Sequence, residues 1–199
     1  AFAARAELRI RIDEGVMEPV PIAIPDFVAA TGNNDVATGL DEVIRGNLER
    51  SGLFRPLDPR SYIETTTDIN SAPRFGDWRI IQAAALVNGQ VTMQDDGRLR
   101  VEFRLWDVYA EQQMVGLQFF TTPENWRRVG HLISDAIYER LTGESGYFDT
   151  RIVFVSEQGP KTNRVKRLTI MDQDGFNPQF LTNGRYLVLT PRFNPTAQT

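Results

Sequence analysis

The residue types of a catalytic triad occur close together in one stretch of the sequence. His131, the only histidine of the chain, is followed by Ser134 and Asp135. On one helix these side chains would lie on adjacent turns, where the base cannot easily point at the nucleophile while water is excluded. A metal site would need at least two more nitrogen or carboxylate ligands, and no His-x-x-x-His pair or carboxylate cluster supplies them. We predict that His131 belongs to the packing of a helix, without a catalytic or metal-binding role.

Other chemistry-bearing motifs are incomplete. The segment 172–175 (DQDG) resembles the middle of a calcium loop, but the acid needed two residues earlier is Ile170, and no bidentate glutamate follows. A polar hairpin turn is the better interpretation. Gly-rich phosphate loops and a nucleophile elbow are missing. Trp78, Trp106 and Trp126 lie in periodic segments, which favours core positions over a ligand site. We therefore predict no catalytic residue, no metal and no cofactor.

Composition and charge narrow the class of protein. The 199 residues are 41% hydrophobic and 24% charged, which is typical of a soluble globular protein, and no run approaches the length of a membrane-spanning helix. Residues 1–150 carry 15 arginines and 23 acids, whereas residues 151–199 carry 7 basic residues and 3 acids. The acidic first part argues against a nucleic-acid partner. The chain has no cysteine, which excludes disulfides and thiolate sites.

The N-terminal segment suggests binding. Glu7–Asp13 alternates strictly, with Leu8, Ile10 and Ile12 on one side, which predicts a strand with one buried face. A strand at a free end can pair with a partner's edge, using its backbone for affinity and alternate side chains for selectivity. An ordinary edge strand is the alternative. The following run, Pro19–Pro25, should be an edge strand or have its prolines at its limits, because proline lacks the ladder donor.

The rest of the first part predicts helices on a sheet. We expect a helix capped by Asp35 and ended by Gly52, a loop over Tyr62–Ala72 and a short helix within Phe75–Ala84. Strands are predicted at residues 85–94, 98–109 and 113–121, followed by a helix from Trp126 to Gly143. The predicted class is an α/β (α+β) domain with helices packed on a mixed sheet.

The hydrophobic period changes after Gly143, so we place a domain boundary within Gly143–Asp149, with domains at residues 1–145 and 146–199. Short strands are predicted at Ile152–Val155, Val165–Met171 and Tyr186–Thr190, which is the layout of a propeller blade. About one blade of a truncated all-β propeller is therefore expected. Four basic residues of this part suggest an anion-facing patch or, as the better interpretation, a solvated hairpin: Lys161, Arg164, Lys166 and Arg167.

The order of these features resembles the periplasmic TolB family of the Tol-Pal system. The matching segments extend over nearly the whole chain: LRIRIDEGV, PIAIPDF, NLERSGLFRPLD, ALVNGQVT, GHLISDAIYERLTGESGYFDTRIVFVS, LTIMDQDGFNPQFLT and PRFNPTAQ. The helix-to-blade segment and DQDGFNPQFLT are specific in combination. In length the chain departs from the family, because it contains only about one blade of a six-bladed propeller. We therefore assign no Pal-contact residue.

The resemblance implies a non-enzymatic adaptor that binds TolA, an inner-membrane protein, through its N-terminal segment, and Pal, a peptidoglycan-associated lipoprotein, through its propeller. Such an adaptor supports outer-membrane integrity, transport and cell division, with neither a nucleic acid nor a small-molecule substrate as partner. The matching segment is Ala4–Val16, and its candidate partner-binding residues are Ala4, Glu7, Leu8, Arg9, Ile10, Arg11, Ile12, Asp13 and Val16.

The resemblance also favours a periplasmic location, with Ala1-Phe2-Ala3 as the remnant of a cleaved signal peptide rather than of cloning. Two alternatives stay open at this point. The chain would be the front part of a propeller-containing hydrolase or peptidase whose catalytic module lies elsewhere, or its first domain would only cap a propeller edge. A GxSxG elbow downstream would favour the hydrolase, and further D-x-D-G blade repeats would favour the adaptor.

Overall fold

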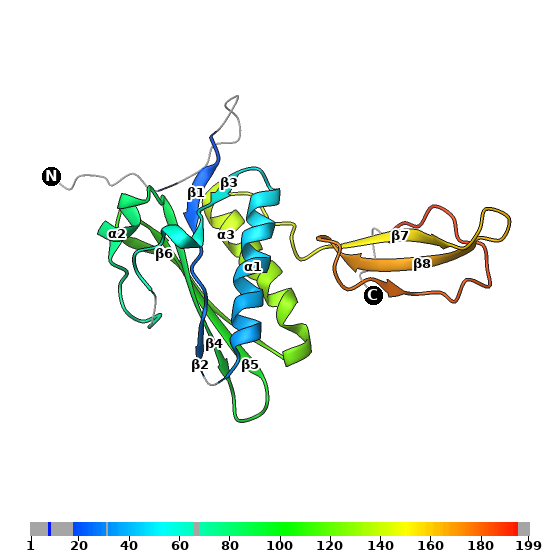
Figure 1. The fold of residues 1–199 in the computed structure, drawn as a ribbon, viewed down its shortest axis with the longest axis horizontal. Helices are drawn as coiled ribbons and strands as arrows, with labels where there is room; N and C mark the ends of the chain where they lie inside the picture. Colours follow the sequence, from blue (N-terminus) through cyan, green and yellow to red (C-terminus); the bar gives the residue numbers. More distant parts are fainter. Residues whose placement is uncertain (1–7, 9–17, 31, 66–67, 195–199) are drawn as a thin grey trace. The chain divides into compact units, whose positions relative to one another are not determined.

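The structure is a computed structural model that describes residues 8, 18–30, 32–65 and 68–194. The chain forms two compact units, residues 1–148 and 149–199 (Figure 1). The described elements of the first unit follow in this order: β1 (Val20–Ala23), β2 (Val28–Ala30), α1 (Asn34–Arg50), β3 (Phe54–Pro56), α2 (Phe75–Ile80), β4 (Ala85–Met93), β5 (Leu99–Asp107), β6 (Gln112–Thr121) and α3 (Trp126–Thr142). Short 3₁₀ turns lie at Pro59–Ser61 and Pro123–Asn125.

The first unit is built on a mixed sheet. Its strands lie in the order β3-β1-β4-β5-β6, and β2 also pairs with β4. β1 is parallel to both of its neighbours, whereas β4, β5 and β6 run antiparallel. Long helices α1 and α3 lie together on one face of the sheet (Figure 1). The predicted class, helices packed on a mixed sheet, is confirmed. Strands β2 and β3 were not predicted, because each has only three residues.

The proline-rich strand is not at an edge, so the first of the two predicted arrangements was wrong; of the second, prolines at the limits of the strand, Pro19 and Pro25 fit because they lie outside β1. β1 lies between β3 and β4, and Pro21 stands inside it. The Pro21 carbonyl accepts a hydrogen bond from the Ala84 N–H, just before regular pairing begins at Ile22 and Ala85. Since Pro21 stands at the start of this ladder, its missing N–H removes little of the pairing with β4.

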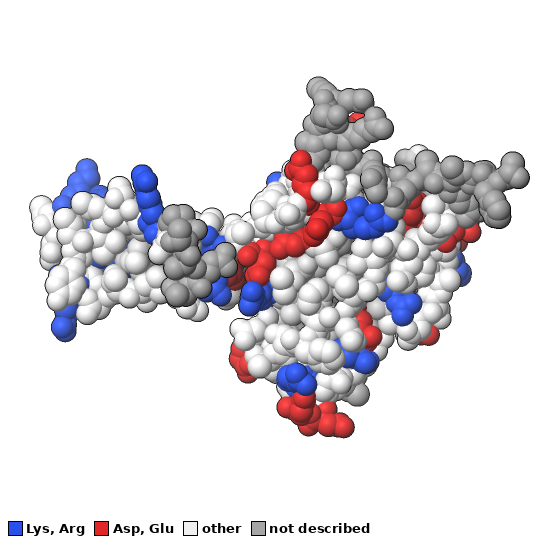
Figure 2. All heavy atoms as spheres, turned by 180° about the vertical axis from the view of Figure 1, so that it is seen from behind, with Lys and Arg blue, Asp and Glu red and all other residues white. Residues whose placement is uncertain are grey.

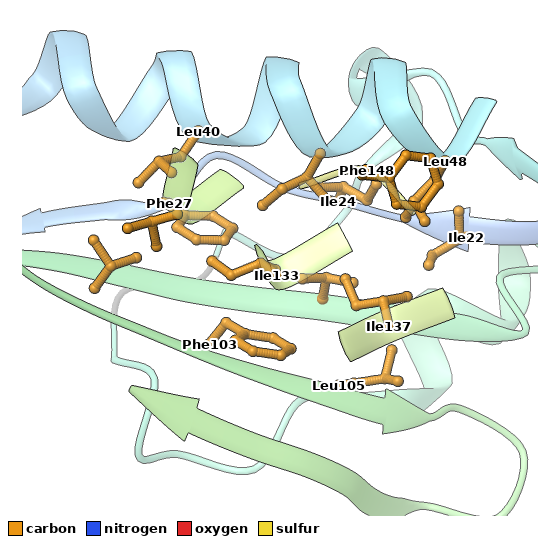
Figure 3. Packing of buried hydrophobic residues seen from close by; sticks show 14 of the residues in the cluster. Ile22, Ile24, Phe27, Leu40, Leu48, Phe103, Leu105, Ile133, Ile137 and Phe148 are labelled. Carbon is orange, nitrogen blue, oxygen red and sulfur yellow. The ribbon is translucent and has the colours of Figure 1, made fainter. Parts of the chain in front are cut away.

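One large hydrophobic core fills the space between α1, α3 and the sheet. Figure 3 shows Leu40 and Leu48 of α1 on the helix side of this core and Phe103 of β5 on the sheet side, with Ile133 and Ile137 of α3 between them. α1 begins one residue before Asp35, so Asp35 lies in the first turn and does not occupy the predicted cap position, which Asn33 takes. The helix is followed by Gly52 and α3 by Gly143, both with positive φ, as the sequence predicted.

A smaller core lies on the other face of the sheet. Alternate residues of β4 point to opposite faces, so Ala85 and Val87 join the large core while Leu86 joins the small one. Trp78 of α2 is fully buried there, and its Nε1 donates to Glu64 Oε2 at 2.6 Å. This core fixes α2 and the loop before it against the sheet.

The second unit is a three-stranded antiparallel sheet of β7 (Arg151–Gln158), β8 (Val165–Asp172) and β9 (Gln179–Phe180). It has no closed barrel and is consistent with a partial propeller. The predicted third strand, Tyr186–Thr190, was wrong: the tight turn after Asp172 lets the nearer Gln179 and Phe180 pair with Ile170 and Thr169. Tyr186 is 81% exposed, which shows that nothing among the described residues covers it.

On the face in Figure 2 several acidic side chains form one continuous band, and the other charged residues are scattered between broad areas of uncharged side chains. Among the helices that the structure describes, none is long and apolar enough to cross a membrane.

Candidate partner-binding site

Leu8 is the described residue of the predicted recognition segment. Its backbone N–H donates to Oδ2 of Asp107 at 3.1 Å, and its half-buried side chain packs against the large core. The hydrogen bond joins positions 99 residues apart in the chain. The other candidate binding residues lie outside the described residues: Ala4, Glu7, Arg9, Ile10, Arg11, Ile12, Asp13 and Val16.

Asp107 holds this contact in place. It is the last residue of β5 and is buried, and its second oxygen, Oδ1, accepts from the N–H groups of Tyr109 and Ala110 at 3.0 and 2.9 Å. The carboxylate therefore closes the turn after β5 with one oxygen and binds the backbone of Leu8 with the other. Sequence reasoning missed Asp107. An aspartate at a strand end, followed by a turn, was the available signal.

A groove of about 610 Å³ opens beside Leu8. Its walls come from the start of β1, from Arg55 of β3, from the connection between α2 and β4, and from Tyr109 after β5. Glu18 and Arg55 bring opposite charges to the groove, and prolines 19 and 21 line it with apolar rings. Such a mixture suits an extended peptide segment, which presents apolar side chains and backbone polar groups in alternation.

The three residues of triad type each contact structural partners outside this set. His131 is buried, and its Nδ1 lies 2.9 Å from Asn47 Nδ2, which also donates to Ser134 Oγ at 2.9 Å. The Ser134 hydroxyl donates to the Gly130 carbonyl at 2.8 Å. Asp135 instead accepts from the Phe148 N–H at 2.6 Å. Through Asn47, His131 and Ser134 therefore join α3 to α1.

Asn47 is the centre of this buried polar contact between the two helices. Replacing Asn47 with alanine removes the hydrogen bonds of its side-chain amide with His131 and Ser134. Because these two polar groups are buried, we expect the free energy of unfolding to fall by about 2 kcal/mol. Urea unfolding measures this loss. Glu49→Ala, at an exposed position of the same helix, is the control and should change stability by less than about 0.5 kcal/mol. Equal effects of the two substitutions would contradict the structural role of Asn47.

A second buried polar group lies on α1. Burial raises the pKa of Asp41 from 3.8 to about 7; the positive charge of Arg45, 3.3 Å away, opposes this rise, and the nearby Asp26 carboxylate adds to it. Arg45 also donates to the Ile24 carbonyl at 2.9 Å, and Tyr62 accepts from the Ile24 N–H. This cluster ties α1 to the break between β1 and β2.

The raised pKa of Asp41 predicts a dependence of stability on pH. The folded state holds the proton more tightly than the unfolded state, so the stabilisation is complete below about pH 4 and is lost as pH rises through about 7. Between pH 5 and pH 8 we expect this group to lower the free energy of unfolding by about 2–3 kcal/mol. Urea titrations of Asp41→Asn should show a correspondingly flatter pH profile. An unchanged profile would show that Asp41 ionises normally.

The basic residues of the second unit form a solvated hairpin, as predicted. Arg164 and Lys166 both pair with Glu157 of β7, and the Arg167 guanidinium lies over the Phe180 ring at 4.7 Å. The segment 172–175 forms the predicted turn, in which the Gly175 N–H donates to the Asp172 carbonyl. Three of the four basic side chains thus have partners within their own sheet.

Comparison with known proteins identifies both parts of the chain. A family model described as the TolB amino-terminal domain matches residues 8–114, and one described as the TolB beta propeller domain matches residues 138–199. Among solved structures, TolB from Acinetobacter baumannii is similar over 88% of this chain, with 28% sequence identity and a TM-score of 0.69. The chain spans 41% of the length of that protein.

Two weaker similarities each cover part of the chain. A PelC dodecamer from Paraburkholderia phytofirmans matches 62% of this chain and 90% of its own, with 15% identity and a TM-score of 0.42. The lipoprotein GNA1162 from Neisseria meningitidis matches 61% of this chain and 96% of its own, with 13% identity and a TM-score of 0.44. At these values the likenesses carry no argument about function.

Proposed function

The chain belongs to the TolB family, and we propose that it acts as a non-enzymatic periplasmic adaptor of the Tol-Pal system. In this proposal the N-terminal segment, Ala4–Val16, binds a TolA-like inner-membrane protein, and the propeller binds a Pal-like peptidoglycan-associated lipoprotein. The adaptor links the two during cell division and supports the integrity of the outer membrane. We assign no residue of the second unit to Pal.

The contact between Leu8 and Asp107 carries this proposal. It holds Leu8 beside the groove through one charge-assisted hydrogen bond and one half-buried side chain. A hydrogen bond to a charged acceptor contributes about 1.5–3 kcal/mol. A single contact of this strength at Leu8 is weak enough for a partner's strand edge to replace it. The segment is thereby suited to exchange between its own domain and TolA.

The proposal is tested by deleting residues 4–12 and titrating the chain into the TolA protein of the same bacterium by calorimetry. We expect the intact chain to bind and the deletion to weaken binding at least a hundredfold. Because the deletion also removes Leu8 from the core, a second variant with Ile10→Asp and Ile12→Asp keeps Leu8 and should lose binding to a similar extent. Unchanged affinity in both variants would contradict the proposal. Circular dichroism confirms that each variant is folded.

A further inference from the structure

An asparagine followed by a glycine brings a reactive side chain next to an unshielded backbone nitrogen. The chain contains this pair twice, at Asn88-Gly89 and at Asn183-Gly184. Because glycine has no Cβ atom, its nitrogen can approach and attack the Cγ atom of the preceding asparagine. The attack expels the side-chain amide as ammonia. Each pair is therefore a candidate deamidation site, and its surroundings decide whether the reaction takes place.

The first pair lies within the sheet of the first unit. Asn88 and Gly89 belong to β4 and stand opposite Arg104 and Phe103 of β5. Asn88 is only 2% exposed, so water has little access to it. The pairing with β5 holds the backbone extended, and it cannot rotate to bring the Gly89 nitrogen onto the Asn88 side chain. We therefore expect Asn88 to keep its amide for as long as β4 stays folded.

The second pair lies in an exposed turn of the second unit. The turn follows β9 and lies outside the described helices and strands, and the Asn183 side chain is exposed. Gly184 has a φ of 81°, in the region that glycine adopts readily. Neither the Gly184 N–H nor the Asn183 Nδ2 group has a hydrogen-bond partner among the described residues. The attacking nitrogen and the leaving group are thus both free.

The turn also activates the Asn183 side chain. The Arg185 N–H donates to Asn183 Oδ1 at 3.0 Å. Since the Gly184 nitrogen lies between these two groups along the chain, the hydrogen bond folds the side chain back over it. When this nitrogen attacks Cγ, negative charge develops on Oδ1, and a donor that already points at Oδ1 stabilises that charge. The same hydrogen bond therefore positions the side chain and favours the attack.

We propose that Asn183 is a site of spontaneous deamidation. The Gly184 N–H gives its proton to the solvent, and the nitrogen forms a bond to Asn183 Cγ. The bond from Cγ to Nδ2 breaks, and Nδ2 takes up a proton and leaves as ammonia, so that a succinimide ring remains. Water then opens the ring at either of its carbonyl groups and gives aspartate or isoaspartate. The reaction consumes water, releases ammonia and adds a negative charge to the turn.

Isoaspartate in this turn would disturb its attachment to β8. The Leu168 N–H donates to Thr182 Oγ1 at 2.9 Å, and the Leu168 carbonyl accepts from the Leu181 N–H at 2.8 Å. Gly184 approaches β8 so closely that a Cβ atom there would collide with the Val165 side chain. Isoaspartate lengthens the main chain by a methylene group between these contacts. We therefore expect the Leu168 amide to lose protection against hydrogen exchange once isoaspartate has formed.

Peptide mass spectrometry tests the proposal on the 199-residue chain, incubated in mildly alkaline buffer either folded or unfolded in guanidinium chloride. In the unfolded chain both Asn-Gly pairs should deamidate at similar rates. In the folded chain we expect Asn183 to react at least tenfold faster than Asn88. Asn183→Gln should abolish the reaction, because the longer side chain closes a less favourable ring. Equal rates at the two sites of the folded chain, or an Asn183 amide that survives folding conditions but not unfolding ones, would overturn the proposal.

Hydrogen exchange of the incubated chain tests the structural consequence. Asn183→Asp is the matched control, since it adds the same charge without lengthening the main chain. We expect the Leu168 amide to exchange at least tenfold faster in the isoaspartate form than in fresh chain, and Asn183→Asp to stay close to fresh chain. Equal protection of Leu168 in the isoaspartate form and in fresh chain would contradict the disturbance of β8. Equally fast exchange in Asn183→Asp would contradict the role of the lengthened main chain.

Discussion

Replacing Gly89 with alanine is expected to lower the free energy of unfolding by about 3 kcal/mol. Gly89 lies in the middle of β4, where a Cβ atom would stand 2.1 Å from the Phe27 ring. Phe27 is buried, so its ring cannot move away without disturbing the large core. The alanine therefore overpacks the site at which the chain passes from β1 to β2.

The effect of Gly89→Ala is measured by urea unfolding against a matched glycine. Gly76 of α2 has open space around its Cβ position and an ordinary backbone conformation. Gly76→Ala should be neutral or stabilising by up to about 1 kcal/mol, because alanine is the better helix former. If Gly89→Ala lowers the free energy of unfolding by less than about 1 kcal/mol, the Phe27 ring moves aside easily and position 89 does not require glycine.

Removing the side chain of Trp78 is expected to lower the free energy of unfolding by about 4 kcal/mol. The Trp78→Ala substitution leaves a cavity at the centre of the small core, where the indole packs edge-on against Tyr62 at 5.2 Å. It also removes the donor that Glu64 accepts from at 2.6 Å. The cavity and the lost hydrogen bond both destabilise α2 and the loop before it. The residues that follow α2, Gln82 and Ala84, line the groove beside Leu8.

A conservative variant separates the two contributions of Trp78. Trp78→Phe keeps most of the ring and loses the hydrogen bond to Glu64, so we expect a loss of about 1–2 kcal/mol. Thermal or urea unfolding of the two variants gives the difference. If Trp78→Phe destabilises the chain as much as Trp78→Ala, the hydrogen bond and not the packing stabilises the small core.

Much of the first unit could be predicted because its long elements have a clear period. The alternation of Leu99, Val101 and Phe103 with charged residues predicts β5, and the helical spacing around Ile133 predicts α3. The short strands β2 and β3 could not be predicted, because three residues give no period. Their pairing depends on the neighbouring strand, a tertiary effect that local sequence does not contain.

The dependence of strand pairing on neighbouring strands also explains the errors at Pro21 and Tyr186. The missing N–H of proline predicts an edge strand or prolines at the limits of the strand, but the order of the strands decides whether that donor is needed. Tyr186–Thr190 has strand-like composition, yet the turn after Asp172 brings Gln179 and Phe180 to β8 first. In both places the register of the sheet overrides the local preference of the residues.

The candidate site could be predicted only in part. The alternating N-terminal segment and the family resemblance point to Ala4–Val16 as a binding segment, which stays a prediction. Asp107 could not be predicted from them, because the contact with Leu8 joins two distant parts of the chain. A hydrogen bond between residues so far apart in the sequence forms only in the folded chain, so the structure is needed to find it.

The most direct test of TolA binding through the N-terminal segment is a competition experiment with that segment alone. A synthetic peptide of residues 4–16 is titrated into the complex of the chain with TolA, and displacement is followed by fluorescence anisotropy. We expect the peptide to displace the chain fully, with an inhibition constant within about tenfold of the chain's own dissociation constant, and a scrambled peptide to leave the complex intact. A complex that persists at saturating peptide would contradict binding through this segment.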